Sequence, residues 1–246
     1  MTDRTILSLT GSDRVSFLQG LVSNDVSKLN GGIAYAALLT PQGKYLADFF
    51  VVDRGDDLLI DVAASLAPML FQRLSMYKLR SDVAIVETDL RVKRGVGPAP
   101  DGAYTDPRHA GLGWRLYGDE QGDGADFDAL RVEHIVPETG IELTPDAFIL
   151  EQGFERLNGV DFRKGCYVGQ EVTARMKHKT ELRKGIARVR IEGTAQTGDT
   201  ILSGEKEVGT LQTVSGDRAI AYLRFDRVSD EMTAGQARVW LDHRPE

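Results

Sequence analysis

The chain has 246 residues, of which 41% are hydrophobic and 27% charged, a composition that is ordinary for a soluble globular protein and excludes a fibrous or disordered chain. No run of about 18 apolar residues occurs, and the opening Met1–Thr5 shows no signal-peptide pattern, so we expect no membrane association and a cytoplasmic location. The net charge of −7 opposes a general DNA- or RNA-coating role, because phosphate binding needs a dominant positive surface.

Residues 1–90 alternate between strand and helix patterns. Apolar runs separated by turn sequences predict strands at Arg4–Leu9, Ile33–Leu39, Tyr45–Val52, Leu58–Val62 and Asp82–Thr88. Apolar residues at helical spacing predict one helix with Val15, Leu18, Val22 and Val26 after a cap at Ser12 or Asp13, and another with Leu66, Leu70, Leu74 and Tyr77 after a cap at Ser65. Because tight turns join the strands and two helices can pack on them, we predict an α+β layer.

The middle of the chain has fewer regular patterns. Gly95–Asp106 and Gly118–Gly124 are predicted as loops, Gly111–Tyr117 as a strand and Asp126–Val136 as a helix. From Lys184 onward, short apolar runs divided by glycine turns predict a small all-β barrel or sandwich. Its clearest strands are Ala187–Ile191, Glu207–Val214, Ala219–Phe225 and Ala237–Leu241.

Positive charge is concentrated between positions 163 and 190. The basic residues are Arg163, Lys164, Arg175, Lys177, His178, Lys179, Arg183, Lys184, Arg188 and Arg190, opposed only by Glu171 and Glu181. This basic stretch is either a solvated face or a surface that attracts an anionic ligand or partner.

The only cysteine, Cys166, lies between Gly165 and Gly169 and two residues after Lys164. One cysteine can form no internal disulfide, which agrees with a reducing compartment. A thiol near a lysine and the start of a predicted short helix at Val172–Met176 would have its thiolate form favoured, and the glycines would let a ligand approach the backbone. The alternative is a buried, inert cysteine, which the polar neighbours disfavour.

Several familiar chemistries are excluded around this cysteine. The local pattern of cysteine proteases is absent, and nothing places any of the four histidines as a base. No spacing is typical of a metal site, and one thiolate could not hold an iron–sulfur cluster alone. The glycine patterns that cradle ATP or dinucleotide phosphates are absent too.

The segment Lys164–Glu171, Lys-Gly-Cys-Tyr-Val-Gly-Gln-Glu, resembles the signature of the YgfZ-type folate-binding proteins, relatives of the glycine-cleavage T protein, an aminomethyltransferase. Nearly the whole chain takes part in this resemblance, which is weakest between Arg91 and Gly124. Further similar segments are Ser16–Gly20, Ser23–Val26, Leu39–Lys44, Tyr77–Val83, Leu130–Glu133 and Ala219–Arg227.

The resemblance implies an α+β fold in which a ring of small domains surrounds a folate channel and a C-terminal β-barrel follows. The expected division is 1–90 and 91–183, forming two interleaved folate-binding subdomains, and 184–246, forming the barrel. The implied cofactor is tetrahydrofolate or a one-carbon or polyglutamylated derivative. The implied role is support of iron–sulfur cluster assembly or repair, with client proteins that include enzymes modifying tRNA, and without direct tRNA or DNA binding.

The resemblance also implies roles for single residues. Cys166 would be the essential catalytic residue. The folate pocket would be shaped by Lys164, Gly165, Tyr167, Gly169, Gln170, Glu171, Arg131, Glu133, Asn24 and Asp25. Four of them have a simpler alternative: Asn24 and Asp25 favour turns, and Arg131 and Glu133 could be an exposed helix pair.

Two other functions stay open, and the sequence leaves undecided whether the protein is an enzyme at all. Aminomethyltransferases usually show two adjacent acidic residues where this chain has Ala47-Asp48, so one carboxylate that could handle protons is missing, which argues against aminomethyl transfer. A non-catalytic module that binds tRNA or an acidic protein through the basic stretch is the third hypothesis. Under the leading hypothesis, that stretch favours folate with a polyanionic polyglutamate tail.

Overall fold

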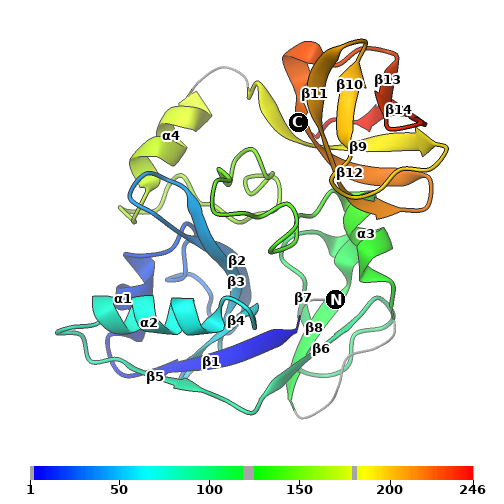
Figure 1. The fold of residues 1–246 in the computed structure, drawn as a ribbon. Coiled ribbons are helices and arrows are strands. Elements are labelled where there is room, and N and C mark those ends of the chain that lie inside the picture. The colour runs from blue at the N-terminus through cyan, green and yellow to red at the C-terminus, as the bar shows by residue number, and fades with distance from the viewer. Residues whose placement is uncertain (1–2, 119–124, 179–181, 246) are drawn as a thin grey trace.

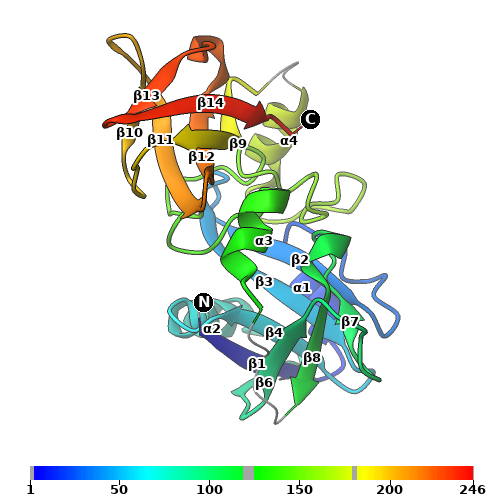
Figure 2. The ribbon, with the colours of Figure 1, turned by 90° about the vertical axis from the view of Figure 1, so that its right-hand side faces the viewer.

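The computed structural model describes residues 3–118, 125–178 and 182–245. These residues form a five-stranded sheet covered by two helices, a three-stranded sheet, a region of long loops and a closed barrel (Figure 1). Figure 2 shows helix α3 (Phe127–His134) between the barrel above and the sheets below. Within this part of the chain, no helix has both the length and the apolar character needed to cross a bilayer.

The five-stranded sheet confirms the predicted α+β layer. Its strands are β1 (Arg4–Thr10), β2 (Ile33–Leu39), β3 (Tyr45–Asp53), β4 (Leu58–Ala63) and β5 (Ala84–Glu87). They pair antiparallel in the order β2-β3-β4-β1-β5. Successive side chains alternate between faces, so Ala36 and Phe49 enter the core under the helices, whereas Tyr35 and Phe50 enter a second core under the loops.

Helices α1 (Arg14–Gln19) and α2 (Ala67–Tyr77) cover one face of this sheet (Figure 1). The predicted extent of α1 was wrong, because the chain leaves the helix after Gln19 and Val22 forms a bridge with Leu38 of β2. The predicted cap at Ser65 was also wrong. Leu66 is the N-cap of α2, and a proline, which needs no backbone N–H partner, occupies the first turn.

A second, three-stranded sheet follows, in the order β6-β8-β7. Its strands are β6 (Arg91–Gly95), β7 (Tyr104–Thr105) and β8 (Trp114–Gly118), with a short 3₁₀ turn at Ala110–Leu112. The predicted strand start at Gly111 was wrong, and β6 and β7 were not predicted. Gly113, between the 3₁₀ turn and β8, has a φ of +71°, and an added Cβ there would lie 1.9 Å from the Gly95 carbonyl oxygen. The backbone at Gly113 is therefore not extended, and β8 begins only at Trp114. The predicted loop beyond Gly118 lies outside the described residues.

The two sheets meet at a buried cluster of charges around Asp61 of β4. Arg4 Nε donates to Asp61 Oδ1 at 2.6 Å, Tyr117 OH donates to Oδ2 at 2.9 Å, and Arg115 forms a further ion pair with the same carboxylate. These two arginines hold the pKa of Asp61 well below its usual range despite the burial of the carboxyl. These groups come from three strands that are distant in the sequence, β1, β4 and β8, so sequence patterns could not reveal the cluster.

Helices α3 and α4 (Gln170–His178) flank the loop region. Asp126 caps α3 by accepting a hydrogen bond from the Ala129 N–H at 3.0 Å, close to the predicted start. The helix ends at His134, because its C-cap Ile135 has a φ of +53°, so the predicted end at Val136 was two residues too long. Helix α4 contains the predicted Val172–Met176 and extends beyond it at both ends.

The C-terminal strands close into a six-stranded barrel, in the order β10-β11-β12-β9-β14-β13, which confirms a barrel rather than a sandwich. Their bounds are β9 (Lys184–Glu192), β10 (Thr200–Ser203), β11 (Lys206–Ser215), β12 (Arg218–Arg224), β13 (Met232–Ala234) and β14 (Ala237–His243). Strands β10 and β13 were not predicted, because four and three residues carry too little alternation. The division of the first 183 residues into two subdomains stays a prediction.

Candidate functional site

The Lys164–Glu171 segment forms the loop that leads into α4. Its side chains alternate between two environments: Lys164 and Tyr167 are buried, at 7% and 8% exposure, whereas Cys166 between them is exposed and free. Tyr167 packs into the same core as Tyr35 and the loop residues around it. The segment is thus anchored on both sides of a thiol that faces solvent. The alternative of a buried cysteine is therefore wrong.

Lys164 anchors the segment to the loop that follows α1. Its ammonium donates to the carbonyl oxygens of Gln19 at 2.8 Å and Asn24 at 2.9 Å, and also to that of Val22. Burial lowers the pKa of Lys164 to about 8, although the nearby carboxylates of Asp25 and Asp161 favour its protonated form. All the hydrogen-bonding capacity of the ammonium is used within the protein, so Lys164 positions the loop rather than facing a ligand.

Asn24 and Asp25 order that neighbouring loop. Asn24 Nδ2 donates to the carbonyl oxygens of Tyr35 at 2.8 Å and Asn158 at 2.7 Å. Asp25 Oδ1 accepts from the Ser27 N–H and hydroxyl, and hydrogen bonds from Lys28 and Ser27 hold the pKa of Asp25 well below its usual range. Both side chains therefore close a turn, as the simpler alternative predicts, and through the Asn24 carbonyl they help to cradle Lys164.

The glycines of the segment differ in what surrounds them. Gly169 has a φ of +84°, and an added Cβ would lie 2.6 Å from the Thr40 carbonyl oxygen. The close approach at Gly169 is thus between two parts of this chain, because the turn that contains Gly43 packs against the start of α4. Gly165, in contrast, has open space around its backbone, since nothing lies within 4 Å of the position of a Cβ.

Gln170 and Glu171 begin α4. Glu171 is exposed, whereas Gln170 lines, together with Tyr167, a small cavity of about 280 Å³. The other residues around this cavity are Asp161, Phe162, Ala174, Lys177 and His178. Cys166 is not among the residues that line this cavity or the larger one described below.

Arg131 and Glu133 lie apart from that segment, on α3, on the opposite side of the central loops (Figure 1). Arg131 is 2% exposed, and its guanidinium bonds to Thr213 of the barrel at 2.9 Å and to Glu142 at 3.2 Å. Glu142 in turn accepts from the Thr213 hydroxyl at 2.6 Å. The expectation that Arg131 faces a folate channel is therefore not met, because its donors are directed into a buried contact between α3 and the barrel.

Glu133 joins the same two elements at the surface. Its carboxylate pairs with Arg188 at 3.0 Å and with Arg218, both on barrel strands. Glu133 is thus an exposed helix residue, as the simpler alternative of an exposed helix pair predicts, but its partners are barrel arginines rather than Arg131. The structure therefore brings Lys164, Asn24 and Asp25 together beside Cys166, but separates Arg131 and Glu133 from them.

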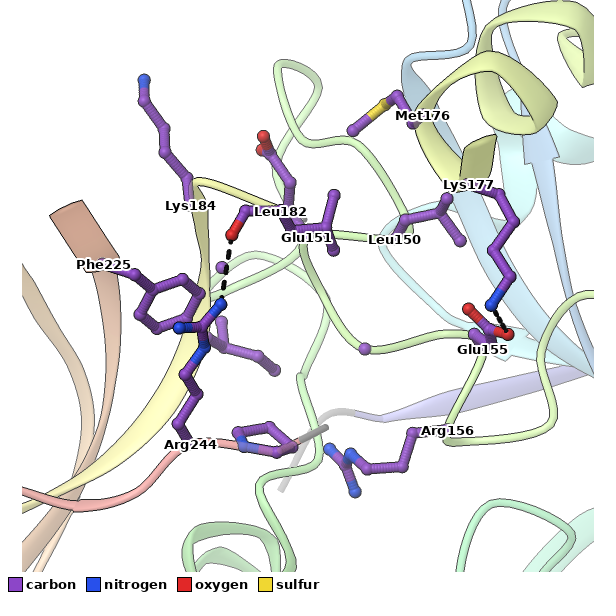
Figure 3. Close-up of a pocket in the computed structure, with 14 residues that line it drawn as sticks. Leu150, Glu151, Glu155, Arg156, Met176, Lys177, Leu182, Lys184, Phe225 and Arg244 are labelled. Atoms are coloured by element: carbon purple, nitrogen blue, oxygen red, sulfur yellow. Dashed lines mark hydrogen bonds and ion pairs between the residues drawn. The ribbon is translucent and has the colours of Figure 1, made fainter. Parts of the chain in front are cut away.

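A cavity with a volume of about 590 Å³ lies where the loop region, α4 and the barrel meet (Figure 3). This volume is within the roughly 300–1,000 Å³ typical of small-molecule sites. Its apolar walls are Leu150, Met176, Leu182, Ile186 and Phe225. Its charged residues are Glu151, Glu155, Arg156, Lys177, Lys184 and Arg244, so four cations face two carboxylates.

The two carboxylates of this cavity differ in their partners. Glu155 forms an ion pair with Lys177, and this pair closes one side of the cavity (Figure 3). Glu151 Oε2 instead accepts from the Tyr222 hydroxyl, at 2.7 Å, and no hydrogen bond to its Oε1 is present among the described residues. Glu151 thus presents an acceptor that a ligand could use.

Arg156 marks the opposite end of the cavity from Glu151 (Figure 3). Its two Nη atoms donate to the carbonyl oxygens of His134 and Ile135, at 3.0 and 2.6 Å. Its Nε is buried and has no hydrogen-bond partner in the described part of the chain, where no carboxylate pairs with it either. Burial lowers the pKa of Arg156, so an anion here would stabilise its charge.

None of these cavity residues was singled out from the sequence except the cations of the basic stretch. Lys177 and Lys184 both line the cavity, although Lys177 pairs with Glu155. Elsewhere in the stretch, Arg188 pairs with Glu133 and Arg190 with Asp217. Part of the basic stretch is therefore neutralised, and its residues Lys179 and Glu181 lie outside the described residues. Arg244 stacks over the Phe225 ring at 4.0 Å, although the two are far apart in sequence.

Comparison with known proteins places the chain beside iron–sulfur assembly factors. Residues 183–244 match the family model of the CAF17 C-terminal beta-barrel domain. The chain is 32% identical over 218 residues to the mitochondrial iron-sulfur cluster assembly factor IBA57 homolog of Mycosarcoma maydis, covering 74% of this chain but only 54% of that protein. It is 27% and 29% identical to mitochondrial IBA57 of Mus musculus and Homo sapiens, in each case over 92% of this chain and 76% of the relative.

The fold matches that of a solved enzyme structure. The glycine cleavage system aminomethyltransferase T from Bartonella henselae superposes with a TM-score of 0.76 and 14% identity, over 98% of this chain and 83% of that one. This confirms the predicted fold class, a T-protein-like α+β region followed by a β-barrel, and at this identity it shows the fold alone.

The relatives' names correct one expectation. All three sequence relatives are named as mitochondrial proteins, which contradicts the predicted cytoplasmic location. The pattern on which that prediction rested, a missing signal peptide, does not distinguish the cytoplasm from an organelle. The relatives are also IBA57 factors, and the YgfZ-type branch is not named among them.

Proposed function

We propose that the protein is a tetrahydrofolate-binding accessory factor for the assembly or repair of iron–sulfur clusters, of the kind formed by the IBA57 and YgfZ-type proteins. The observation that carries the proposal is the similarity to proteins named as iron–sulfur cluster assembly factors, which extends over 92% of this chain for the two mammalian relatives. Iron–sulfur enzymes, including those that modify tRNA, are then its clients.

The large cavity supports folate as the ligand, because its two ends differ in charge. Glu151 lies toward one end and can accept hydrogen bonds from the N–H groups of a pterin ring. Arg156 at the other end suits a carboxylate of a glutamate tail, and Lys184 and Arg244 add positive charge on the barrel side of the cavity. Between them the apolar side chains of Leu150, Leu182 and their neighbours suit an aromatic linker. The residues present therefore fit a reduced folate.

A bound reduced folate would supply amine nitrogens that carry or accept a one-carbon unit. The chain's own contribution is to orient it: Glu151 and Arg156 bind the two ends, and the apolar walls exclude water. Cys166 lies outside the cavity lining, so we infer that its exposed thiol meets a partner or client protein rather than the folate.

Aminomethyl transfer is the less favoured function, because the expected carboxylate is occupied. Asp48 is buried, and its oxygens accept from the hydroxyls of Tyr35 at 3.0 Å, Tyr45 at 2.6 Å and Thr139 at 2.6 Å. Three of the roughly four acceptor sites of this carboxylate are thus used within the protein, which leaves little capacity to handle a substrate proton. The neighbouring residue, Ala47, supplies no second carboxylate.

The proposal is tested by complementation of cells that lack their own IBA57-type factor. Wild-type protein should restore the activity of iron–sulfur enzymes, and Cys166→Ala should not, although it should fold normally because the thiol is exposed. Arg175→Gln on the exposed face of α4 serves as the control and should rescue fully. Failure of the wild type to rescue would contradict the accessory role, and equal rescue by Cys166→Ala would remove Cys166 from it.

The folate part is tested separately with purified protein. Isothermal titration with 5-formyltetrahydrofolate, a stable reduced folate, should show binding to wild type that Arg156→Met weakens strongly. Absence of binding to the wild-type protein would contradict folate as the ligand. Production of methylene-tetrahydrofolate from an aminomethylated lipoyl carrier would favour the transferase instead.

A further inference from the structure

The barrel takes part in building the large cavity through two adjacent strands. Tyr222 on β12 and Ile186 on β9 lie directly opposite each other in the barrel register. Both contact Glu151: the Ile186 N–H donates to the Glu151 carbonyl oxygen at 2.9 Å, and the Tyr222 hydroxyl donates to its carboxylate at 2.7 Å. The backbone and the side chain of Glu151 are thus both fixed by the barrel, although Glu151 itself lies in the loop region.

Three of the other charged groups around the cavity have partners other than the Glu151 carboxylate. Lys177 pairs with Glu155, and Arg156 donates to two backbone carbonyls at the far end. Arg244 donates to the Leu182 carbonyl oxygen at 3.3 Å. Among the described residues, Tyr222 is therefore the one side chain that hydrogen-bonds to the Glu151 carboxylate. Burial and the nearby carboxylate raise the pKa of Tyr222, so its hydroxyl stays a donor at neutral pH.

We propose that Tyr222 is a positioning residue for ligand recognition: its hydroxyl holds Glu151 Oε2, and so directs Oε1 into the cavity, where it accepts from the amino group and ring N–H at the pterin end of a folate. This inference rests on the proposed folate-binding function and extends it, because it assigns part of the specificity for that end to the C-terminal barrel. The carboxylate would otherwise be free to rotate about its side-chain bonds, and ordering it in advance lowers the entropy lost on binding.

The position of Tyr222 also makes ligand recognition depend on the position of the barrel relative to the loop region. The hydroxyl reaches Glu151 only while β9 and β12 are held against the loop region by the Ile186–Glu151 hydrogen bond and by the buried Arg131–Glu142–Thr213 contact. A ligand bound between Glu151 and Arg156 would in turn stabilise that arrangement, because binding and docking share the same contacts.

The test compares two ligands in four proteins by isothermal titration. The ligands are 5-formyltetrahydrofolate and its analogue without the 2-amino group. The proteins are wild type, Tyr222→Phe, Glu151→Gln and the double variant. Tyr222→Phe keeps the ring and removes only the hydroxyl, and it should weaken binding of the natural ligand about tenfold, the size of one hydrogen bond to a charged group. Binding of the analogue should weaken less, because the analogue has lost one of the two donors to Oε1, so discrimination between the ligands falls.

The double variant and a matched control sharpen the result. Because Tyr222 acts through Glu151, the double variant should bind no more weakly than Glu151→Gln alone. Tyr77→Phe removes the hydroxyl of an exposed tyrosine on α2 and should leave both affinities unchanged. Thermal melts establish that every variant is folded before titration.

The outcomes separate this inference from the function on which it rests. Wild-type protein that binds the natural ligand, with Tyr222→Phe weakening both ligands equally or neither, would overturn the positioning role and leave folate binding intact. A wild-type protein that binds neither ligand would overturn folate binding and the positioning role with it. A double variant weaker than either single variant would show that Tyr222 acts independently of Glu151, and would also overturn the inference.

Discussion

At the scale of single residues, the Lys164–Glu171 segment holds an exposed thiol in a fixed position. Lys164 fixes its beginning through three backbone carbonyls, and Tyr167 fixes its middle in the core. Gly169 fixes its end, because the turn before β3 packs directly against it. The predicted site residues therefore act mainly by holding Cys166 in place, while the chemistry of the larger cavity depends on residues that carry no motif.

Substitution of Gly169 tests how tightly the Lys164–Glu171 segment is packed. Gly169→Ala places a Cβ 2.6 Å from the Thr40 carbonyl oxygen at a backbone φ of +84°, so we expect a loss of about 1–3 kcal/mol in the free energy of unfolding. Gly165→Ala is the matched control, since its surroundings are empty, and should change stability by less than about 0.5 kcal/mol. Urea unfolding measures both, and equal stabilities for the two variants would contradict the close packing at Gly169.

At the scale of elements, α3 is the connector between the sheets and the barrel. Its Arg131 enters a buried contact with Glu142 and Thr213, whereas its Glu133 pairs with two barrel arginines at the surface. The two residues were predicted together as parts of a folate pocket. In the structure both residues lie at the contact between α3 and the barrel, and only the buried Arg131 is expected to matter for stability.

This difference is measurable. Arg131→Met leaves the buried Glu142 carboxylate without its cationic partner and should lower the free energy of unfolding by about 3–5 kcal/mol. Glu133→Gln breaks only exposed ion pairs and should cost less than about 1 kcal/mol. Guanidinium unfolding followed by circular dichroism compares the two. A small effect of Arg131→Met would mean that the contact between α3 and the barrel is held by its apolar side chains alone.

At the scale of the whole molecule, a chain of net charge −7 concentrates cations around one cavity. Lys184 begins the first strand of the barrel, Arg244 follows its last strand, and Arg156 lies in the loop region. Their convergence gives an acidic protein a local site for an anion. Such a site attracts a polyanionic ligand more strongly than its overall charge suggests.

Binding of reduced folate should therefore weaken as ionic strength rises, and more steeply for a pentaglutamate than for a monoglutamate. Replacement of Arg156 and Lys184 by methionine should reduce that salt dependence, whereas Arg175→Met, outside the cavity lining, should leave it unchanged. Titrations at several salt concentrations measure the slopes. Affinities that do not vary with salt would contradict an electrostatic role for these cations.

The sequence by itself determined the local elements and the unusual loop. Alternation and helical spacing predicted the five strands of the first sheet, the strands of the barrel that exceed four residues, and four helices, because these patterns depend on neighbours in the chain. The composition around Cys166 correctly predicted an exposed rather than a buried thiol. The short strands, the end of α1 and the start of β8 were missed, because tertiary contacts such as that between Gly113 and Gly95 decide them.

Only the tertiary structure decided which residues share a site. It separated Arg131 and Glu133 from Cys166, and it brought Glu151, Arg156 and Arg244 together around one cavity. Neither result could follow from sequence spacing, because a side chain's partners are set by how the loop region, α4 and the barrel pack. The physical reason is that local patterns report which face of an element is buried, whereas a binding site is formed by side chains from several elements that meet only after folding.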